Sequence, residues 1–285
     1  MTPADRPFRS VLYIPGSKPR ALEKARTLPV DAIIFDLEDA VAPDEKENAR
    51  NTLAEYLTEG GYAPRQVIVR INGADTPWGR DDLATFARLS PDAILLPKVN
   101  GAGDVAAAAQ SLTGSTRVWA MMETPEGILN AASIARAPAM GGFVMGTNDL
   151  AKDLGCRTRA DRLPLMTALQ TCLLAARAAA IPCIDGVFNA FKDEEGLRAE
   201  CEQGRDLGMD GKTLIHPAQI AVANAVFAPK VDEIDLARRQ IKAFEAAMAA
   251  GQGVAVLDGR IVENLHVDTA RRTLAKHAAI TALEN

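Results

Sequence analysis

The feature that most constrains the fold of this chain is a repeated alternation of short apolar runs with longer amphipathic stretches. The runs rich in Val, Ile, Leu and Met are predicted to be strands, and there are eight: residues 10–16, 31–39, 66–72, 93–99, 117–124, 142–149, 183–187 and 211–217. Plausible helices lie between most of them, such as residues 44–57 and 160–180. Runs that are almost continuously apolar are typical of parallel strands covered by helices.

Eight βα repeats predict an α/β fold, a (β/α)₈ TIM barrel, whose active site forms at the carboxyl ends of the strands. A doubly wound parallel sheet is the alternative, but nothing in the sequence marks a switch point or a domain break. The hydrophobic content of 48 % is ample for a sizeable core.

The pattern changes after Phe227. Residues 232–250 read as a helix, Gly251-Gln252-Gly253 breaks it, residues 254–262 could form a hairpin around Asp258-Gly259, and residues 266–279 read as a last helix. We therefore predict a barrel domain over residues 1–228 and a C-terminal extension over residues 229–285. This extension would serve as a lid or an oligomer contact, or would pack across the barrel.

Composition excludes several classes of partner. A net charge of −5 argues against nucleic-acid or membrane binding, because both require a basic surface. No apolar run is long enough to span a bilayer, and the first residues lack the apolar region of a signal peptide. The four cysteines show neither a CxxC motif nor metal-ligand spacing, so we expect reduced core thiols and a cytoplasmic protein.

Two carboxylates follow neighbouring predicted strands. Glu123 ends the run at 117–124 and Asp149 ends the run at 142–149, about one strand–helix repeat later. If these strands are parallel neighbours, both acids emerge at the same edge of the sheet. Two oxygen ligands without a nearby Cys or His suit a hard divalent cation, most simply a Mg²⁺ ion that keeps some of its water.

Charged residues also follow the first two strands. After strand 10–16 come Lys18, Arg20 and Lys24, which would attract phosphates at the start of a helix, or would simply be solvated. Strand 31–39 ends in several acids, of which Glu38 and Asp39 would accept hydrogen bonds from the waters of a metal ion. Capping of the next helix by Asp39 is an equally simple interpretation.

Three basic or titratable residues end later strands. Arg70 lies between Val69 and Ile71, where burial requires an anion, either Asp36 of this chain or a substrate carboxylate. Lys98 is predicted to pair with the acids rather than to form a Schiff base, because an acid-rich site keeps its amine protonated. His216, before Pro217, is expected to support a helix entry rather than to act as a base.

Several of these segments together resemble a known family. Residues 9–16 (RSVLYIPG), 35–41 (FDLEDAV), 69–72 (VRIN), 122–127 (METPEG) and 215–217 (IHP) are similar, in this order, to the citrate lyase β-subunit-like (CitE-like) proteins. These proteins belong with the malyl-CoA lyases to the HpcH/HpaI aldolase superfamily. The resemblance extends from about residue 9 to residue 230 and implies a (β/α)₈ barrel, a trimer or hexamer, Mg²⁺ and a CoA thioester.

The resemblance assigns roles to individual residues of this chain. Glu123 and Asp149 would be the metal ligands, with Glu123 also facing the substrate, and Arg70 would hold the substrate's oxo or carboxylate group. Four residues would lie along the phosphates and pantetheine of CoA: Tyr13, Lys18, Arg20 and Lys24.

The resemblance also draws attention to the tail. Related lyases supply a catalytic Asp to a neighbouring subunit from a Gly-x-x-x-Asp pattern. The matching stretch here, residues 259–264, reads GRIVEN, so Glu263 stands where that Asp is expected. A carboxylate is retained, but with a longer side chain.

The predicted activity is reversible C–C cleavage of a carboxylated 3-hydroxyacyl-CoA, of the malyl-CoA or citramalyl-CoA type, to a 2-oxo acid and an acyl-CoA. Glu263, Glu38 or Asp39 would move the proton. Alternatives are a citrate lyase β subunit acting on a carrier-protein thioester, a metal-dependent pyruvate-type aldolase acting on free oxo acids, and a noncatalytic subunit that binds CoA.

Overall fold

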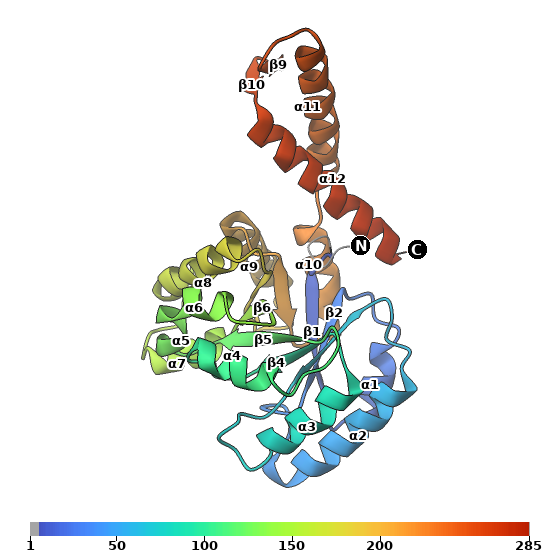
Figure 1. Cartoon of the computed structure of the whole chain (residues 1–285), viewed down its shortest axis with the longest axis vertical. Coiled ribbons are helices and arrows are strands. Elements are labelled where there is room, and N and C mark those ends of the chain that lie inside the picture. Colours follow the sequence, from blue (N-terminus) through green and yellow to red (C-terminus); the bar gives the residue numbers. More distant parts are fainter. Residues whose placement is uncertain (1–5, 285) are drawn as a thin grey trace. The chain divides into compact units, whose positions relative to one another are not determined.

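The computed structural model describes residues 6–284 and divides the chain into two compact units. One unit is Phe8–Phe227, and the other contains the segment that begins at Ala228 (Figure 1). No helix within residues 6–284 is both long and apolar enough to cross a membrane.

The first unit is a closed barrel of parallel strands, so the predicted TIM barrel is confirmed and the doubly wound sheet is not formed. The strands follow one another around the barrel in sequence order, and β8 pairs with β1 to close it. Their bounds are β1 Ser10–Pro15, β2 Ala32–Asp36, β3 Gln66–Arg70, β4 Ala93–Leu96, β5 Arg117–Met122, β6 Met140–Met145, β7 Cys183–Asp185 and β8 Gly211–Leu214.

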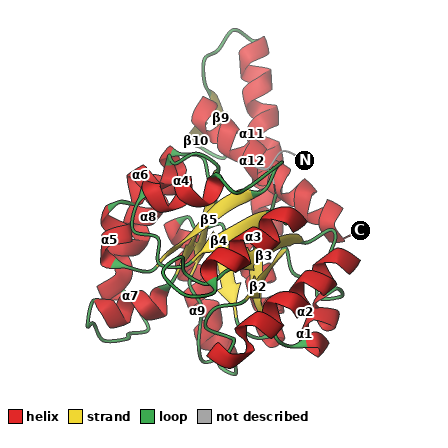
Figure 2. Ribbon diagram, turned by 60° about the horizontal axis from the view of Figure 1, so that its bottom comes forward, coloured by secondary structure: helices red, strands yellow, loops and turns green. Residues whose placement is uncertain are grey.

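Helices surround the strands (Figure 2). They are α1 Pro19–Ala25, α2 Lys46–Glu59, α3 Gly79–Leu89, α4 Ala102–Ala109, α5 Pro125–Leu129, α6 Ala131–Ala135, α7 Thr147–Asp153, α8 Met166–Ala178, α9 Glu194–Leu207 and α10 Ile220–Phe227, with short 3₁₀ turns at Pro43–Glu45, Leu163–Leu165 and Pro217–Gln219.

Alternate residues of the strands build two apolar layers, because successive side chains of a strand point to opposite faces. Inside the barrel, Trp119 packs against Phe8 with ring centroids 5.3 Å apart. A β-carbon at Gly142 would lie 2.7 Å from the Trp119 ring, so β6 can pass this ring only with glycine there. The larger layer lies between the strands and the helices. A filled interior leaves only the mouth of the barrel for a ligand.

The strands are shorter than the sequence predicts, and this changes the setting of Asp149. Residues 147–149 do not extend β6 but form the first turn of α7, with Gly146 at its N-cap. A β-carbon at Gly146 would lie 2.4 Å from the β-carbon of Glu123, so the chain turns out of the sheet at a position that only glycine fills. An acidic residue in a first helical turn is favoured by the helix dipole.

The second unit is a helical hairpin with a small antiparallel sheet. It contains α11 Val231–Ala249, β9 Ala255–Leu257, β10 Arg260–Val262 and α12 Asn264–Glu284. Asp258 and Gly259 both have positive φ, 48° and 75°, as a two-residue type I′ turn requires. Its own small core contains Ala247, Ala255, Val262 and Val267.

Candidate active site

The centre of the candidate site is an arginine held by carboxylates of the same chain. Arg70 ends β3 beside Asp36, which ends β2. Its Nε donates to Asp36 Oδ1 at 2.7 Å and its Nη2 donates to Asp36 Oδ2 at 2.6 Å. Both side chains are buried, and the guanidinium lies over the Tyr13 ring, 5.0 Å from its centroid. Asp36 therefore supplies the anion that burial of Arg70 requires.

The third nitrogen of Arg70 faces the two acids of the β2–α2 loop. Nη1 lies 2.8 Å from Glu38 Oε2 and 3.3 Å from Asp39 Oδ2. Burial raises the pKa of Glu38 to about 7, Arg70 opposes that rise, and Asp39 and Asp36 add to it. Because Asp39 is 67 % exposed, its longer contact is the one that an incoming anion can most easily replace.

Glu123 follows the last residue of β5 and is only 2 % exposed. Its Oε1 accepts a hydrogen bond from the Lys98 main-chain N–H at 2.7 Å. Lys98 has φ +50°, a left-handed conformation that few non-glycine residues adopt, and this conformation aims its N–H at Glu123. Burial raises the pKa of Glu123 to about 7, the Lys98 hydrogen bond opposes that rise, and the charges of Glu38 and Asp149 add to it.

Glu123, Asp149 and Arg70 line one cavity of about 330 Å³, together with Tyr13, Asp36 and Asp39. The half-buried Asp149 is close enough to Glu123 for its charge to raise the pKa of that residue. The two predicted metal-site acids therefore share the same pocket although they come from different kinds of element.

The pocket fits a hard cation that keeps some of its water better than a cation whose ligands all come from protein side chains. Residues 6–284 contain no cluster of three or more His, Cys, Asp or Glu side chains that could hold a metal ion. Two carboxylates that repel one another in a buried pocket would both gain from a cation between them. Mg²⁺ usually retains several waters and uses one or two carboxylates, which matches this donor set.

The residues predicted to follow CoA differ in their setting. Tyr13 lies in the cavity, donates its hydroxyl to Met121 Sδ at 3.4 Å, and has a pKa well above its usual value because it is buried. Lys18, Arg20 and Lys24 are exposed at α1 and line neither this cavity nor the cavity of about 710 Å³ that shares residues with it. Their role in phosphate binding stays a prediction.

Two further predicted residues lie apart from the pocket. Glu263 is exposed in the second unit, where its N–H donates to His266 Nδ1 at 3.1 Å, so its catalytic role stays a prediction. His216 accepts from the Ala218 N–H at 3.1 Å and stacks on Phe191, which is the expected helix-entry role.

The exposed Lys98 follows β4, close to three acids of the site. Burial lowers the pKa of its amine, but Glu38, Asp149 and Glu123 outweigh this effect and the pKa is raised. A protonated amine does not form a Schiff base, so the structure favours the ion-pair role.

Sequence reasoning missed two amides at the rim of the cavity. Asn148, in the first turn of α7, and Asn189, in the loop after β7, donate to each other's side-chain oxygens at 3.3 and 2.8 Å. Asn148 could have been noticed because it precedes Asp149. Nothing in the sequence around Asn189 distinguishes it, because only the closed barrel brings the loop after β7 next to the start of α7.

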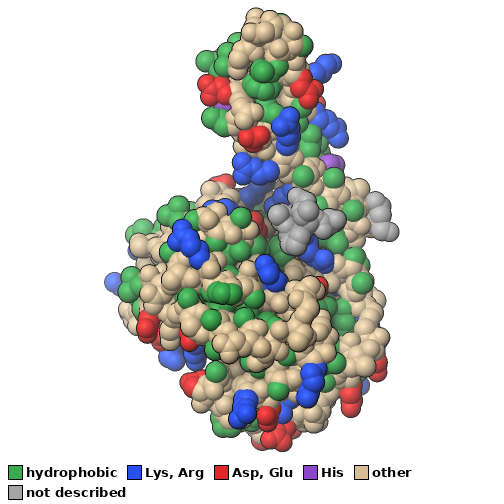
Figure 3. Space-filling model, viewed as in Figure 1, with side chains coloured by type: hydrophobic (Ala, Val, Ile, Leu, Met, Phe, Trp, Pro, Cys, Tyr) green, Lys and Arg blue, Asp and Glu red, His purple; other side chains and the backbone are tan. Residues whose placement is uncertain are grey.

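On the face shown in Figure 3, basic side chains of the barrel are scattered among acidic and apolar ones.

The family model for HpcH/HpaI aldolase/citrate lyase matches residues 9–217, and the chain belongs to this family. A (3S)-malyl-CoA thioesterase from Cereibacter sphaeroides is 64 % identical over 97 % of this chain and 96 % of its own. Citrate lyase subunit beta from Leuconostoc mesenteroides subsp. cremoris is 36 % identical over 95 % of this chain and 93 % of its own.

Among solved structures, protein CitE from Mycobacterium tuberculosis in complex with magnesium, acetoacetate and coenzyme A is similar with a TM-score of 0.81. It is 30 % identical, and the match covers 96 % of this chain and 99 % of that one. The family is one of enzymes, and magnesium and coenzyme A are bound in this related structure.

Proposed function

We propose that this chain is a Mg²⁺-dependent enzyme acting on a malyl-type CoA thioester, and that its main reaction is hydrolysis of the thioester bond. The observation that carries the proposal is the convergence of Glu123, Asp149 and Arg70 on one small cavity. This set offers a cation site and a fixed positive charge to a substrate that carries a carboxylate and a polarised carbonyl. The 64 % identity to a (3S)-malyl-CoA thioesterase favours hydrolysis.

Glu123 and Asp149 would hold Mg²⁺, which would act as a Lewis acid towards substrate oxygens. Arg70 would stabilise the negative charge that develops on the thioester oxygen, and Asp36 would keep the guanidinium in place through its two hydrogen bonds. This fixed orientation favours the transition state because no reorganisation is needed during the reaction.

We propose Glu38 as the proton acceptor of the barrel, because burial raises its pKa to about 7. Its Oε2 lies 2.8 Å from Nη1 of Arg70, which lines the cavity, but Oε2 itself is buried and makes no hydrogen bond within the described residues. In hydrolysis, water forms the new C–O bond and gives a proton to Glu38, the C–S bond breaks, and the CoA sulfur receives that proton. The products are a hydroxy acid and free CoA.

C–C cleavage of the same substrate is the second candidate, favoured by the 36 % identity to a citrate lyase β subunit. In this reaction Glu38 would remove the proton of the substrate hydroxyl, which becomes the carbonyl oxygen of the 2-oxo acid. The C–C bond breaks, its electron pair forms the enolate of acetyl-CoA, and this enolate is then protonated. Glu263 and Asp39 remain the other proposed proton carriers. A carrier-protein thioester, a free oxo acid without CoA, and CoA binding without catalysis are the remaining alternatives.

One assay separates these reactions. The protein is incubated with (3S)-malyl-CoA and MgCl₂, free thiol is measured with a disulfide reagent, and glyoxylate is trapped as its phenylhydrazone. Thiol without glyoxylate is the expected result, and glyoxylate without thiol would instead establish C–C cleavage.

Variants Asp149→Asn and Glu123→Gln are expected to abolish either reaction, whereas Asn48→Ala on the exposed face of α2 is a control outside both cavities. Full turnover in Asp149→Asn would overturn the metal assignment. If the unmodified protein released neither thiol nor glyoxylate but still bound CoA, this result would support the noncatalytic alternative.

A further inference from the structure

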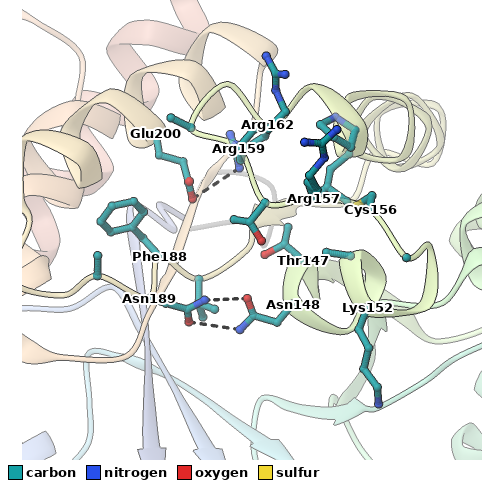
Figure 4. Close-up of a pocket in the computed structure, with 18 residues that line it drawn as sticks. Thr147, Asn148, Lys152, Cys156, Arg157, Arg159, Arg162, Phe188, Asn189 and Glu200 are labelled. Carbon is teal, nitrogen blue, oxygen red and sulfur yellow. Dashed lines mark hydrogen bonds and ion pairs between the residues drawn. The ribbon is translucent and has the colours of Figure 1, made fainter.

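A second, larger cavity lies next to the candidate active site. It has a volume of about 710 Å³ and is formed mainly by the segment from α7 to the start of α8 and by the loop after β7 (Figure 4). Four residues line both cavities: Thr147, Asn148, Val187 and Asn189. We call the larger one the side cavity and these four residues the shared wall.

The most easily opened part of the shared wall is the Asn148–Asn189 amide pair. The two amides donate to each other at 3.3 and 2.8 Å and are both exposed (Figure 4). Asn148 comes from the first turn of α7 and Asn189 from the loop after β7, and the two hydrogen bonds between them join side chains only. Removing one amide therefore opens a connection without removing any backbone hydrogen bond.

The side cavity is positively charged in a chain that is negative overall. Its lining contains Lys152, Arg157, Arg159 and Arg162 but one acid, Glu200. Asp161 pairs with Arg159, and Asp185 pairs with Arg162. Within residues 6–284, the exposed Lys152 and Arg157 have no carboxylate partner.

Arg162 adds a second, independent observation. Its side chain is 5 % exposed, and its Nη2 has no hydrogen-bond partner among the described residues. A buried guanidinium nitrogen without an acceptor is costly, and a carboxylate would satisfy it.

We propose that the Asn148–Asn189 pair determines the size of the acid that binds beside Glu123 and Asp149, and that the side cavity can receive the distal carboxylate of a longer dicarboxylic oxo acid. This inference rests on the proposed function, because it takes the small cavity as the site of an oxo or hydroxy acid. With the pair intact, the wall rejects chains longer than those of small oxo acids. With the pair broken, the distal carboxylate enters a cavity lined by Lys152, Arg157 and Arg162, whose Nη2 has no partner among the described residues.

The test uses the full-length Asn189→Ala variant with saturating Mg²⁺ and three acids measured by calorimetry: pyruvate, 2-oxopentanoate and 2-oxoglutarate. The two larger acids have the same carbon chain and differ by the distal carboxylate. We expect Asn189→Ala to bind 2-oxoglutarate about tenfold more tightly than the unmodified protein does, because a size limit of a few atoms has been removed. The gain should disappear when Arg157→Ala is added.

Asn148→Ala should give the same gain from the opposite side of the wall, and Asn48→Ala, the same substitution outside both cavities, should give none. Unchanged 2-oxoglutarate binding in both wall variants would overturn the inference. Equal gains for 2-oxopentanoate and 2-oxoglutarate would overturn the dicarboxylic assignment. If the unmodified protein did not bind pyruvate in the presence of Mg²⁺, the proposed function would be wrong, and the inference about the wall would not be the cause of the negative result.

Discussion

At the scale of single residues, the site depends on how buried charges are paired. Arg70 keeps its orientation because two of its nitrogens donate hydrogen bonds to Asp36, whereas the exposed Asp39 makes a longer contact with the third. Breaking a buried pair leaves an uncompensated charge, whereas loss of an exposed partner is compensated by water. The two acids therefore differ in their expected contribution to stability although both contact the same arginine.

Asp36→Asn is expected to lower the free energy of unfolding by about 3–5 kcal/mol, because Arg70 loses its buried partner. Asp39→Asn is the matched control and should cost about 1 kcal/mol or less. Urea unfolding followed by circular dichroism measures both values. Similar small losses in the two variants would show that Asp36 does not hold the guanidinium.

The cysteines provide a prediction about pH. Burial raises the pKa of the Cys172 and Cys201 thiols to about 12 and raises that of Cys183 well above its usual value, so all three stay protonated between pH 7 and pH 9. Cys156 is half-buried and lines the side cavity. Because the thiolate is the reactive form, one thiol per chain should react quickly with a disulfide reagent throughout this range.

In denaturant, all four thiols should react, which provides the control for reagent and protein concentration. A second fast thiol at pH 9 in the folded protein would contradict the burial of the other three.

At the scale of elements, the site depends on where strands end and helices begin. The two metal-site acids come together because β6 stops at Met145 and α7 starts at Thr147, with Gly146 passing close to Glu123. A longer strand would carry Asp149 past the mouth of the barrel. Gly146 is therefore needed because a side chain there would collide with Glu123, and its backbone φ is not positive.

Gly146→Ala tests this contact. The added β-carbon would lie 2.4 Å from Glu123, so we expect a loss of about 1–3 kcal/mol in stability together with loss of Mg²⁺-dependent turnover. Gly103→Ala in α4 has nothing within 4 Å of the added atom and should leave both properties intact. Normal turnover in Gly146→Ala would mean that the position of α7 does not govern the metal site.

At the scale of the whole molecule, the chain divides into a barrel that carries the cavity and a C-terminal unit that carries Glu263. The C-terminal unit has its own helices, hairpin and small core. If Glu263 of the second unit carries the proton, replacing it should lower the turnover rate but should not change Mg²⁺ affinity, because the proposed metal ligands Glu123 and Asp149 belong to the barrel.

Glu263→Gln is accordingly expected to reduce turnover by about 10²-fold while leaving Mg²⁺ affinity unchanged, because general acid–base catalysis contributes effects of this size. Steady-state kinetics and metal titration measure the two properties separately. The matched control is Glu245→Gln, an exposed residue of α11 in the same unit. Undiminished turnover in Glu263→Gln would remove this residue from the mechanism and leave Glu38 and Asp39.

The sequence by itself determined the barrel, because eight apolar runs separated by amphipathic segments have few other ways to bury their side chains. It also pointed to Glu123, Asp149 and Arg70, because charged residues directly after apolar strands gather at one edge. Local signals such as Asp258-Gly259 were sufficient for the hairpin of the C-terminal unit.

Only the tertiary structure decided the contacts between distant loops. It placed Asp149 on a helix, joined the Lys98 N–H to Glu123, and brought Asn189 to Asn148. Periodicity along the chain reports which face of an element is buried, and it carries no information on which loops meet at the mouth of a closed barrel. The fold was therefore readable from the pattern of residues, whereas the shape of the pocket and its wall depended on the closure of the barrel.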